Sequence, residues 1–430
     1  MTYEACLDYL YNRLPMFSRI GAAAYKKDIH NTIALCEALG NPQQQFKSIH
    51  IAGTNGKGST SHMLAAMLQQ QGYTTGLYTS PHIKDFGERI KIDGIMIDKN
   101  FVIDFTQKTK DICQAIEPSF FELTVAMAFC YFAGKKVDIA VIETGLGGRL
   151  DSTNIITPIL SIITNVGLDH MNLLGDTVEK IAVEKAGIIK AEIPVVIGES
   201  KDKTRSLFEE KAKALQAPIY WAEELYTIIN AQIKCDHQYI DITDNTHQHT
   251  ETFELDLTGQ YQIKNLRTVI AAEKILHTLG FPIDEQHEKY ALSHVRALTG
   301  LRGRWDVTGH APTIIHDVAH NKDGITQVLQ QLQSTYAQSH WHFVLGFVND
   351  KDITDILKLL PANASYYFTN AHIARALPHE RLSAIAATLG LKGKSYDDVN
   401  EAIAAAKLNA QPEDVVMVCG SFFILAEIKD

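Results

Sequence analysis

The sequence lacks the signatures of several large protein classes. Its six cysteines, at positions 6, 36, 113, 130, 235 and 419, form no C-x-x-C pair, which argues against a zinc ribbon or a thioredoxin motif. No run approaches the ~18 apolar residues of a membrane span. The start, MTYEACLDYLYNRL, carries acidic residues and no apolar signal-peptide segment. Because free thiols suit a reducing compartment, we expect a cytoplasmic protein with no membrane partner.

The chain also lacks an excess of positive charge. It contains 40 lysines and arginines and 50 aspartates and glutamates, which gives a formal net charge of -10. A protein that binds nucleic acid non-specifically needs basic side chains to replace phosphate counterions, so we expect no nucleic-acid partner. The sequence shows no internal repeat or low-complexity tract. A hydrophobic content of 46% and a charged content of 21% describe a folded globular protein.

The length and the hydrophobic pattern indicate more than one domain. About 150 residues per domain predict two or three domains for a chain of 430 residues. Apolar strands alternate with helical segments in both parts, which is typical of an α/β fold with parallel sheets. Residues 217–257 alternate apolar and polar side chains and predict an antiparallel β insertion. Since LTGLRGR (298–304) resembles a linker, we expect domains at 1–297 and 298–430.

Individual elements follow from periodicity and from turn residues. We expect helices over 3–14, 29–39, 59–70, 99–116, 119–133, 262–279 and 284–296. We expect strands within 49–52, 74–81, 137–148, 158–170, 193–200, 312–316, 342–346, 365–369 and 415–419, and a hairpin at 88–97.

A glycine-rich turn between a strand and a helix is the strongest local signal. Residues 49–63 read IHIAGTNGKGSTSHM, so Lys57 follows two glycines and precedes a helix. Backbone amides at such a helix N-terminus bind phosphate. The spacing departs from a Walker A loop because Gly58 follows the lysine where a magnesium-binding hydroxyl is usual. Hydroxyls come only at Ser59 and Thr60, so another group has to complete a magnesium shell.

Ser80 and Glu143 are candidates for that metal site, whereas the nearby motif residues His170 and Lys185 read as structural residues when taken alone. Ser80 and Glu143 end strands at the edge where open α/β sheets hold ligands, although Ser80 also suits a turn before Pro81. His170 ends the next strand-loop, but imidazole prefers softer metals than magnesium. Lys185 on its own resembles a surface lysine.

Two further groups of polar residues have alternative interpretations. Arg149, Asp151 and Asn154, in GLGGRLDSTN, either line a substrate cleft or brace their own loop. The histidines at 237, 247 and 249 are either metal ligands or solvated histidines around a turn, and the composition of their segment favours the turn.

Taken together, the motifs resemble the folylpolyglutamate synthases and bifunctional dihydrofolate synthases, which belong with the Mur ligases. The shared segments are GTNGKGS, YTSPH, ERI, GLGGRLDSTN, LDH, EKAGIIK and AHN, in the family's order and spacing over about residues 20–425. The resemblance implies a P-loop parallel-sheet ATPase domain with a small antiparallel β insertion. It also implies a smaller, Rossmann-like C-terminal α/β domain that carries the glutamate-ligase part.

The family resemblance implies roles for particular residues. Lys57, Lys185 and His320 match its catalytic positions. ATP-binding positions are matched by Thr54, Asn55, Gly56, Lys57, Gly58, Ser59, Thr60, Asn265, Arg304 and Asp317. Ligands of two Mg²⁺ ions are matched by Ser80, Glu143, His170 and a carbamylated Lys185. Substrate positions are matched by Pro81, Arg149, Asp151, His320 and Ser421. Val318 and Lys322 in DVAHNK, and YQIKNL for HQxxNA, depart from the family pattern.

The implied activity is ATP-dependent addition of L-glutamate to dihydropteroate, to tetrahydrofolate (poly)glutamates, or to both, through an acyl phosphate. We expect both activities, small-molecule partners only, and a monomer. A Mur-type peptide ligase is less suitable because only 48 residues precede Ile49, too few for a nucleotide-sugar domain. A non-catalytic nucleotide switch of the GTPase type would show NKxD, whereas NDKD at 349–352 has the wrong order.

Overall fold

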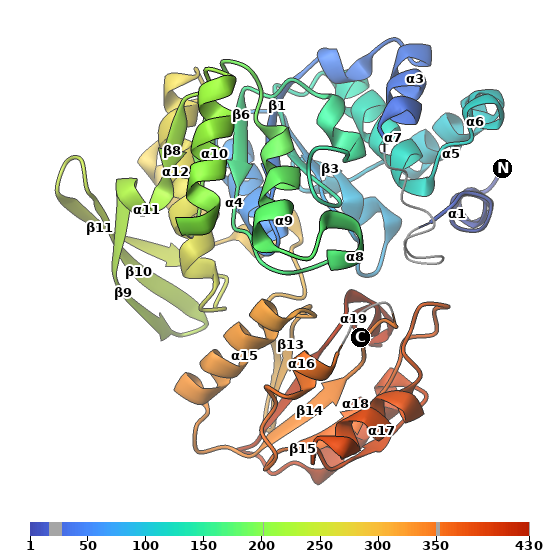
Figure 1. The fold of residues 1–430 in the computed structure, drawn as a ribbon, viewed down its shortest axis with the longest axis vertical. Helices are drawn as coiled ribbons and strands as arrows, with labels where there is room; N and C mark the ends of the chain where they lie inside the picture. The colour runs from blue at the N-terminus through green and yellow to red at the C-terminus, as the bar shows by residue number, and fades with distance from the viewer. Residues whose placement is uncertain (17–27, 201, 350–352, 430) are drawn as a thin grey trace. The chain divides into compact units, whose positions relative to one another are not determined.

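The computed structural model describes residues 1–16, 28–200, 202–349 and 353–429. These residues form two compact units (Figure 1): the first ends at Leu301, and the second contains Arg302 onward together with Thr258–Gln260. A division after residue 297 would cut helix α14 (Val295–Thr299), so the boundary is better drawn after Leu301. Residues 350–352 of the NDKD segment lie outside the described residues.

The first unit is built on a sheet of eight strands. Its spatial order is β4 (Ile95–Met96), β3 (Ile90–Ile92), β2 (Thr75–Tyr78), β5 (Ile139–Glu143), β1 (Lys47–Ala52), β6 (Leu160–Ile163), β7 (Val195–Ile197) and β8 (Ile219–Trp221). Neighbouring strands from β2 to β8 are parallel, and the β3–β4 hairpin adds two antiparallel strands at one edge. The expected hairpin at 88–97 is therefore part of the main sheet.

Both faces of this sheet are buried, which explains why its strands read as continuous apolar runs. In β5, Ile139 and Val141 join one core with helices α4 (Lys57–Gln71) and α12 (Gln262–Thr278). Ala140 and Ile142 point to the opposite core, with α7 (Phe120–Lys135). Helices α9 (Val178–Lys185) and α10 (Asp202–Ala214) extend the cover on that opposite face beside β6 and β7. The predicted α/β class is confirmed.

Smaller helices complete the first unit, and two of the expected helices are divided. The remaining helices are α1 (Tyr3–Asn12), α3 (His30–Ala38), α5 (Lys99–Lys108), α6 (Lys110–Ile116), α8 (Met171–Leu174), α11 (Ala222–Leu225), α13 (Glu285–Leu292) and α14. The helix expected over 99–116 is divided at Thr109, and the one expected over 284–296 is divided at Ser293 and His294.

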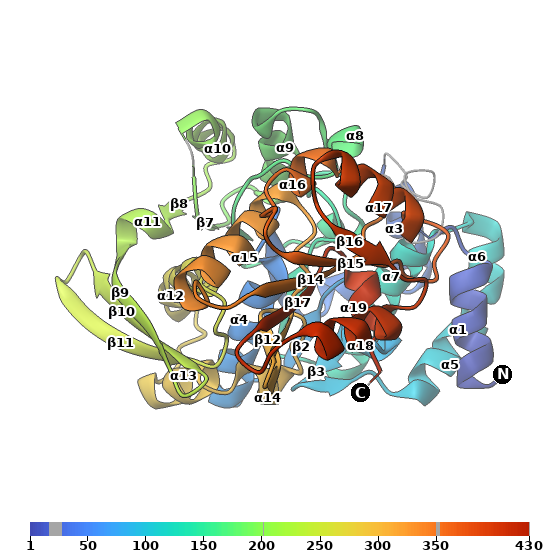
Figure 2. The same cartoon turned by 90° about the horizontal axis from the view of Figure 1, so that it is seen from below.

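The expected antiparallel insertion is present, but it begins later than predicted. Strands β9 (Tyr226–Lys234), β10 (His237–Asp244) and β11 (His249–Leu255) form a separate sheet that projects from the first unit in Figures 1 and 2. Residues 219–221, which we assigned to the insertion, instead form β8 and pair in parallel with β7. Ile240, Ile242 and Phe253 face the core shared with α12, as one-sided burial predicts.

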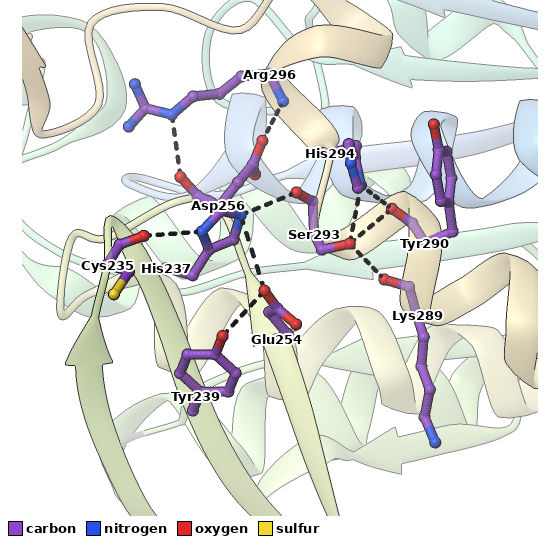
Figure 3. Close-up of polar contacts among 10 residues, drawn as sticks. All are labelled: Cys235, His237, Tyr239, Glu254, Asp256, Lys289, Tyr290, Ser293, His294 and Arg296. Atoms are coloured by element: carbon purple, nitrogen blue, oxygen red, sulfur yellow. Dashed lines mark hydrogen bonds and ion pairs between the residues drawn. The ribbon is translucent and has the colours of Figure 1, made fainter.

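Polar contacts hold the insertion to Ser293, which follows α13, and to the start of α14 (Figure 3). The His237 ring contacts the Cys235 carbonyl at 3.2 Å and the Ser293 carbonyl at 3.3 Å. The Arg296 amide donates to the Asp256 carboxylate at 2.8 Å. His247 pairs with Asp244 at 2.9 Å. His237 and His247 therefore contact protein groups, and within the described ranges no group of three metal-ligating side chains occurs.

The second unit is a smaller α/β structure with a six-stranded sheet. Its order is β12 (Asp306–His310), β13 (Thr313–His316), β17 (Val415–Cys419), β14 (Trp341–Leu345), β15 (Ser365–Phe368) and β16 (Gly393–Ser395). All neighbours are parallel except β12, which pairs antiparallel with β13. The pattern predicted the four central strands, and the short edge strands β12 and β16 were not expected.

Helices cover both faces of the second sheet, as Figure 2 shows. Helices α15 (Lys322–Thr335), α16 (Thr354–Leu357) and α17 (His379–Thr388) share one core with Phe343 and Met417 of the sheet. Helices α18 (Val399–Asn409) and α19 (Phe422–Glu427) pack against the strands from the other side. Across the described parts of both units, no helix is both long and apolar enough to cross a membrane.

Candidate active site

The glycine turn between β1 and α4 has the geometry of an anion-binding loop. Helix α4 begins at Lys57, and in the described structure no side-chain hydrogen bond caps it, so its first amides are available to a ligand. Gly56 has φ of +83°, and a Cβ there would lie 2.3 Å from the Asn265 Oδ1 atom. Only glycine fits this position. The Lys57 ammonium lies over the loop and donates to the Gly53 carbonyl at 3.1 Å.

The segment after β6 holds this loop in shape. The Thr54 hydroxyl donates to the Gly167 carbonyl at 3.1 Å and accepts from the Gly167 amide at 3.0 Å. The Asn55 amide donates to Asn165 Oδ1 at 2.9 Å, and the Thr164 hydroxyl donates to the Asn55 carbonyl at 2.6 Å. We did not predict Thr164 or Asn165 as site residues. The available signal was the polar end of the apolar strand in IITNVGLDH.

The start of α12 contacts the other side of the loop. The Gln262 side chain donates to the Ser59 hydroxyl at 3.1 Å and accepts from Asn265 at 2.8 Å. Ser59 and Thr60 are 1% and 0% exposed. The displaced hydroxyls are therefore buried against the protein, and the structure brings the predicted nucleotide residue Asn265 beside the loop.

Ser80 and Glu143 meet at the carboxyl edge of adjacent parallel strands. Ser80 follows β2, Glu143 ends β5, and the Ser80 amide donates to the Glu143 carboxylate at 3.3 Å. Glu143 is 4% exposed. A hydroxyl and a carboxylate are the oxygen donors that Mg²⁺ prefers, and Mg²⁺ keeps several waters in addition. The residues present therefore fit a magnesium ion without a larger protein cage.

Lys185 is not the surface lysine that its local sequence suggests. It ends α9 and is 2% exposed. Burial lowers its pKa to about 7, the Lys57 charge acts in the same direction, and Asp169 and Asp151 oppose the shift. A fraction of this lysine is thus a neutral amine near pH 7. His170 lies nearby in sequence, with φ of 49°, and its amide donates to Asp169 at 2.8 Å.

Within the GLGGRLDSTN loop, Asp151 is a bracing residue. The buried Thr153 hydroxyl donates to Asp151 at 2.5 Å, so it accepts from His50 Nε2 at 2.8 Å. Burial lowers the pKa of His50 to about 3, which keeps the ring neutral. Burial also raises the pKa of Asp151, against the effect of its hydrogen bonds. His50 and Thr153 are positioning residues that we did not predict.

The other two polar residues of the loop differ in exposure. Asn154 donates to the Arg149 and Gly187 carbonyls, both at 3.1 Å, and so braces the loop. Arg149 pairs with Glu184 at 2.7 Å, with its side chain 52% exposed. Pro81 is exposed beside Ser80. Arg149 and Pro81 are therefore exposed, whereas Asp151 and Asn154 are buried and form hydrogen bonds within the loop and to its neighbours.

Replacing Thr153 with valine should destabilise the first unit. The change leaves His50 Nε2 without its acceptor and removes one donor from Asp151, both in a fully buried place. We expect the free energy of unfolding to fall by about 2 kcal/mol or more in a urea titration. Thr153→Ser is the matched control, since it keeps the hydroxyl and should cost less than half as much.

In the second unit, the predicted residues gather around Phe422 and the end of β13. The Arg304 guanidinium lies 5.2 Å from the Phe422 ring centre, and the His320 ring lies 5.9 Å from it. Asp317 is 2% exposed and accepts from the Trp305 amide at 2.9 Å and the Ala319 amide at 2.7 Å. Ser421 caps α19 by accepting from Phe423 at 3.1 Å. Asp317 and Ser421 thus also stabilise the local backbone by accepting hydrogen bonds from its amides.

Comparison with known proteins matches both units. The Mur ligase middle domain family matches residues 51–273, and the Mur ligase glutamate ligase domain family matches residues 303–422. These two ranges contain every site residue predicted from the sequence.

Individual relatives match nearly the whole chain. The Bacillus subtilis dihydrofolate synthase/folylpolyglutamate synthase is 31% identical over 99% of this chain and 98% of its own length. A Haloferax volcanii bifunctional folylpolyglutamate synthase/dihydropteroate synthase is 32% identical over all of this chain, which spans half of that protein. The structure of Escherichia coli FolC in complex with DHPP and ADP has a TM-score of 0.85 at 28% identity, covering 99% and 96% of the two chains. The chain therefore belongs to the Mur ligase superfamily, in the branch of folylpolyglutamate and dihydrofolate synthases, and is an ATP-dependent ligase.

Proposed function

We propose that the protein joins the amino group of L-glutamate to the carboxylate of a pteroate-type acid at the expense of ATP. The observation that carries the proposal is the phosphate loop and the buried Lys185 in one unit, with the Lys57 charge close enough to lower the pKa of Lys185. A plain nucleotide switch gives no reason to bury a second lysine there.

The reaction follows from the chemistry of the substrates. A carboxylate is a poor electrophile, so its oxygen first attacks the γ-phosphorus of ATP, ADP leaves, and an acyl phosphate forms. The amine of L-glutamate then attacks the acyl carbon, loses a proton, and displaces phosphate. In this proposal Lys57 and the first amides of α4 hold the phosphate oxygens. Thr54 and Asn55, fixed by the segment after β6, keep these amides in position.

The proposal includes magnesium ions and a carbamate, which the polypeptide does not itself supply. Ser80 and Glu143 would hold one Mg²⁺, which offsets the negative charge of the phosphate oxygens. His170 and a carbamylated Lys185 would hold a second. A neutral lysine can take up carbon dioxide and become an anion, and the lowered pKa of Lys185 supplies that neutral amine near pH 7.

The residues of the second unit complete the assignment. By similarity to the family motifs, we propose Arg304 and Asp317 as ATP contacts, with Asn265 from the first unit. His320 and Ser421 are proposed for the incoming glutamate. The shared neighbour Phe422 supports neighbouring positions for the Arg304 and His320 contacts. We also propose that the protein is a monomer. The six free thiols support the proposal that it works in the reducing cytoplasm.

We propose that both pteroate and folate acceptors are used. The Bacillus subtilis relative is named for both synthase activities, and the Escherichia coli FolC structure contains DHPP. A Mur-type peptide ligase would use the same chemistry on a different acid, so the acceptor decides between the two.

The deciding experiment measures phosphate release from magnesium-ATP and L-glutamate, with dihydropteroate or tetrahydrofolate as acceptor. Mass spectrometry of the products should show one added glutamyl residue on each acceptor. Extension of tetrahydrofolate alone would reduce the assignment to a polyglutamate synthase. If neither acceptor is extended while ATP still binds, the folate assignment is wrong and another amide ligase becomes the better candidate.

A further inference from the structure

Beyond the residues assigned above, the loop that follows Ser80 carries a histidine and an arginine of the TSPH and ERI segments that no step has used. We propose that His82 donates a hydrogen bond from Nε2 to a carboxylate oxygen of the pteroate-type acceptor, and that Arg89 is the positioning residue that fixes this donor. The inference rests on the proposed function and adds an acceptor-specific residue to it.

The first observation is a buried guanidinium without an acidic partner. Arg89 is 5% exposed, and among the described residues it forms no ion pair, although the charges of Glu88 and Glu143 partly offset the effect of burial on its pKa. The neighbouring Glu88 is occupied by the amides of Ile83 at 2.7 Å and Lys84 at 2.9 Å. Buried cations are normally paired, so an unpaired one marks a place where a negative group is favoured.

The second observation is the contact between the two side chains. Arg89 Nε donates to His82 Nδ1 at 2.6 Å. An arginine can only donate, so Nδ1 carries no proton and the ring proton sits on Nε2. The imidazole is thereby held as a neutral donor in one tautomer, with the positive charge of Arg89 behind it.

The third observation is where Nε2 lies. His82 is half-buried, its Nε2 has no hydrogen-bond acceptor among the described side chains and backbone, and it is not among the buried unpartnered atoms. The ring follows Ser80, whose amide contacts Glu143, at the edge where open α/β sheets bind ligands. The donor is therefore accessible and adjacent to the proposed reaction centre.

The surroundings favour an aromatic acid over a peptide. The His82 ring lies 6.1 Å from Tyr11 and 6.4 Å from Phe86, and Phe120 lies 5.7 Å from Tyr11. The Arg89 guanidinium lies 5.1 Å from the Phe120 ring centre. A single hydrogen-bond donor for an anion, bordered by aromatic rings, matches an aryl carboxylate. A peptide would need several backbone partners.

The test compares two substitutions at His82 that differ only in the donor. His82→Phe keeps a flat ring without the N–H, and His82→Gln keeps an amide donor near the Nε2 position. We expect His82→Phe to raise KM for dihydropteroate, or lower kcat/KM, by about 10- to 100-fold, and His82→Gln to stay within about 5-fold. KM for ATP should change less than about 2-fold in both. His237→Phe, far along the chain in the β insertion, is the matched control.

A measurement on the unmodified enzyme covers the case in which a variant fails to fold. Nitrogen-15 NMR should show His82 as the Nε2-protonated tautomer, and dihydropteroate with magnesium-ADP should shift its Nε2 signal while magnesium-ADP alone does not. Arg89→Met should remove the tautomer preference and add no further loss to His82→Phe. An unshifted signal, or equal kinetics for His82→Phe and the unmodified enzyme, overturns the inference. If the unmodified enzyme extends no pteroate acceptor at all, it is the proposed function that fails.

Discussion

Replacing Lys185 with methionine should lower kcat by about 100- to 1,000-fold, the usual loss when a preorganised electrostatic group is removed from an active site. Methionine fills the same buried space, so packing beside α9 should survive. The physical reason is that the lowered pKa of about 7 gives Lys185 a neutral amine that can carry a carbamate. Steady-state phosphate release with both substrates saturating is the measurement.

Bicarbonate dependence separates a carbamate from a simple charge. Lysine reacts with carbon dioxide only as a neutral amine, so carbamylation should increase as pH rises through about 7 and decline below it. Enzyme stripped of carbon dioxide at low pH should regain activity after bicarbonate is added at pH 8. A carbon-13 carbamate signal should appear with labelled bicarbonate and be absent from Lys185→Met.

The matched control for Lys185 is on the same helix. Lys180 pairs with Asp176 at 2.8 Å, and its side chain is 63% exposed. Lys180→Met should leave kcat within about 2-fold, since exposed ion pairs contribute little. If Lys185→Met retains full activity, or if it loses activity but bicarbonate never matters, the carbamate proposal is wrong.

Replacing Gly56 with alanine should nearly abolish ATP use. The residue has φ of +83°, and the new Cβ would meet Asn265 Oδ1 at 2.3 Å, so both the loop and Asn265 must shift. The shift moves the amides that hold phosphate, and misplacement by about 1 Å costs roughly 100-fold in rate. We expect kcat/KM for ATP to fall at least about 100-fold.

Gly40→Ala is the control for backbone strain alone. Gly40 has φ of +80°, and a Cβ there meets nothing within 4 Å. Both variants should lose about 1–2 kcal/mol of stability from the left-handed backbone, measured by urea unfolding. Only Gly56→Ala should lose activity. Equal kinetics for the two variants would contradict a role for the tight approach of Asn265 to the loop.

Much of the fold is predictable from sequence because the signals are local. Buried parallel strands are continuous apolar runs, and the glycine turn at 53–56 is recognisable without neighbours. The edge strands β12 and β16 were not predicted, since Asp306–His310 and Gly393–Ser395 are short and partly polar. The prediction placed β8, the first strand after α10, in the wrong sheet. Which strands pair depends on the tertiary fold, and the local sequence does not report it.

The candidate site shows the same division. Ser80, Glu143 and Lys57 are identifiable by their places at strand ends and at the helix start. Lys185 is not, because VEKAGIIK has the pattern of an exposed helix and only the folded chain buries it. The contacts of Thr54 and Asn55 with Gly167 and Asn165 span 113 and 110 positions, which no local pattern reports.

That long separation has a consequence for how the chain folds as it is made. Strand β1 lies inside its sheet, between β5 and β6. The next strand along the chain, β2, does not pair with β1, because β5 lies between them. A nascent chain that ends before residue 139 therefore exposes both edges of β1, and such edges invite aggregation. The phosphate loop takes its final shape only after Gly167 and later Gln262 and Asn265 of α12 are synthesised. ATP should therefore bind and stabilise the first unit only when that unit is nearly complete. Shorter nascent chains should not bind ATP.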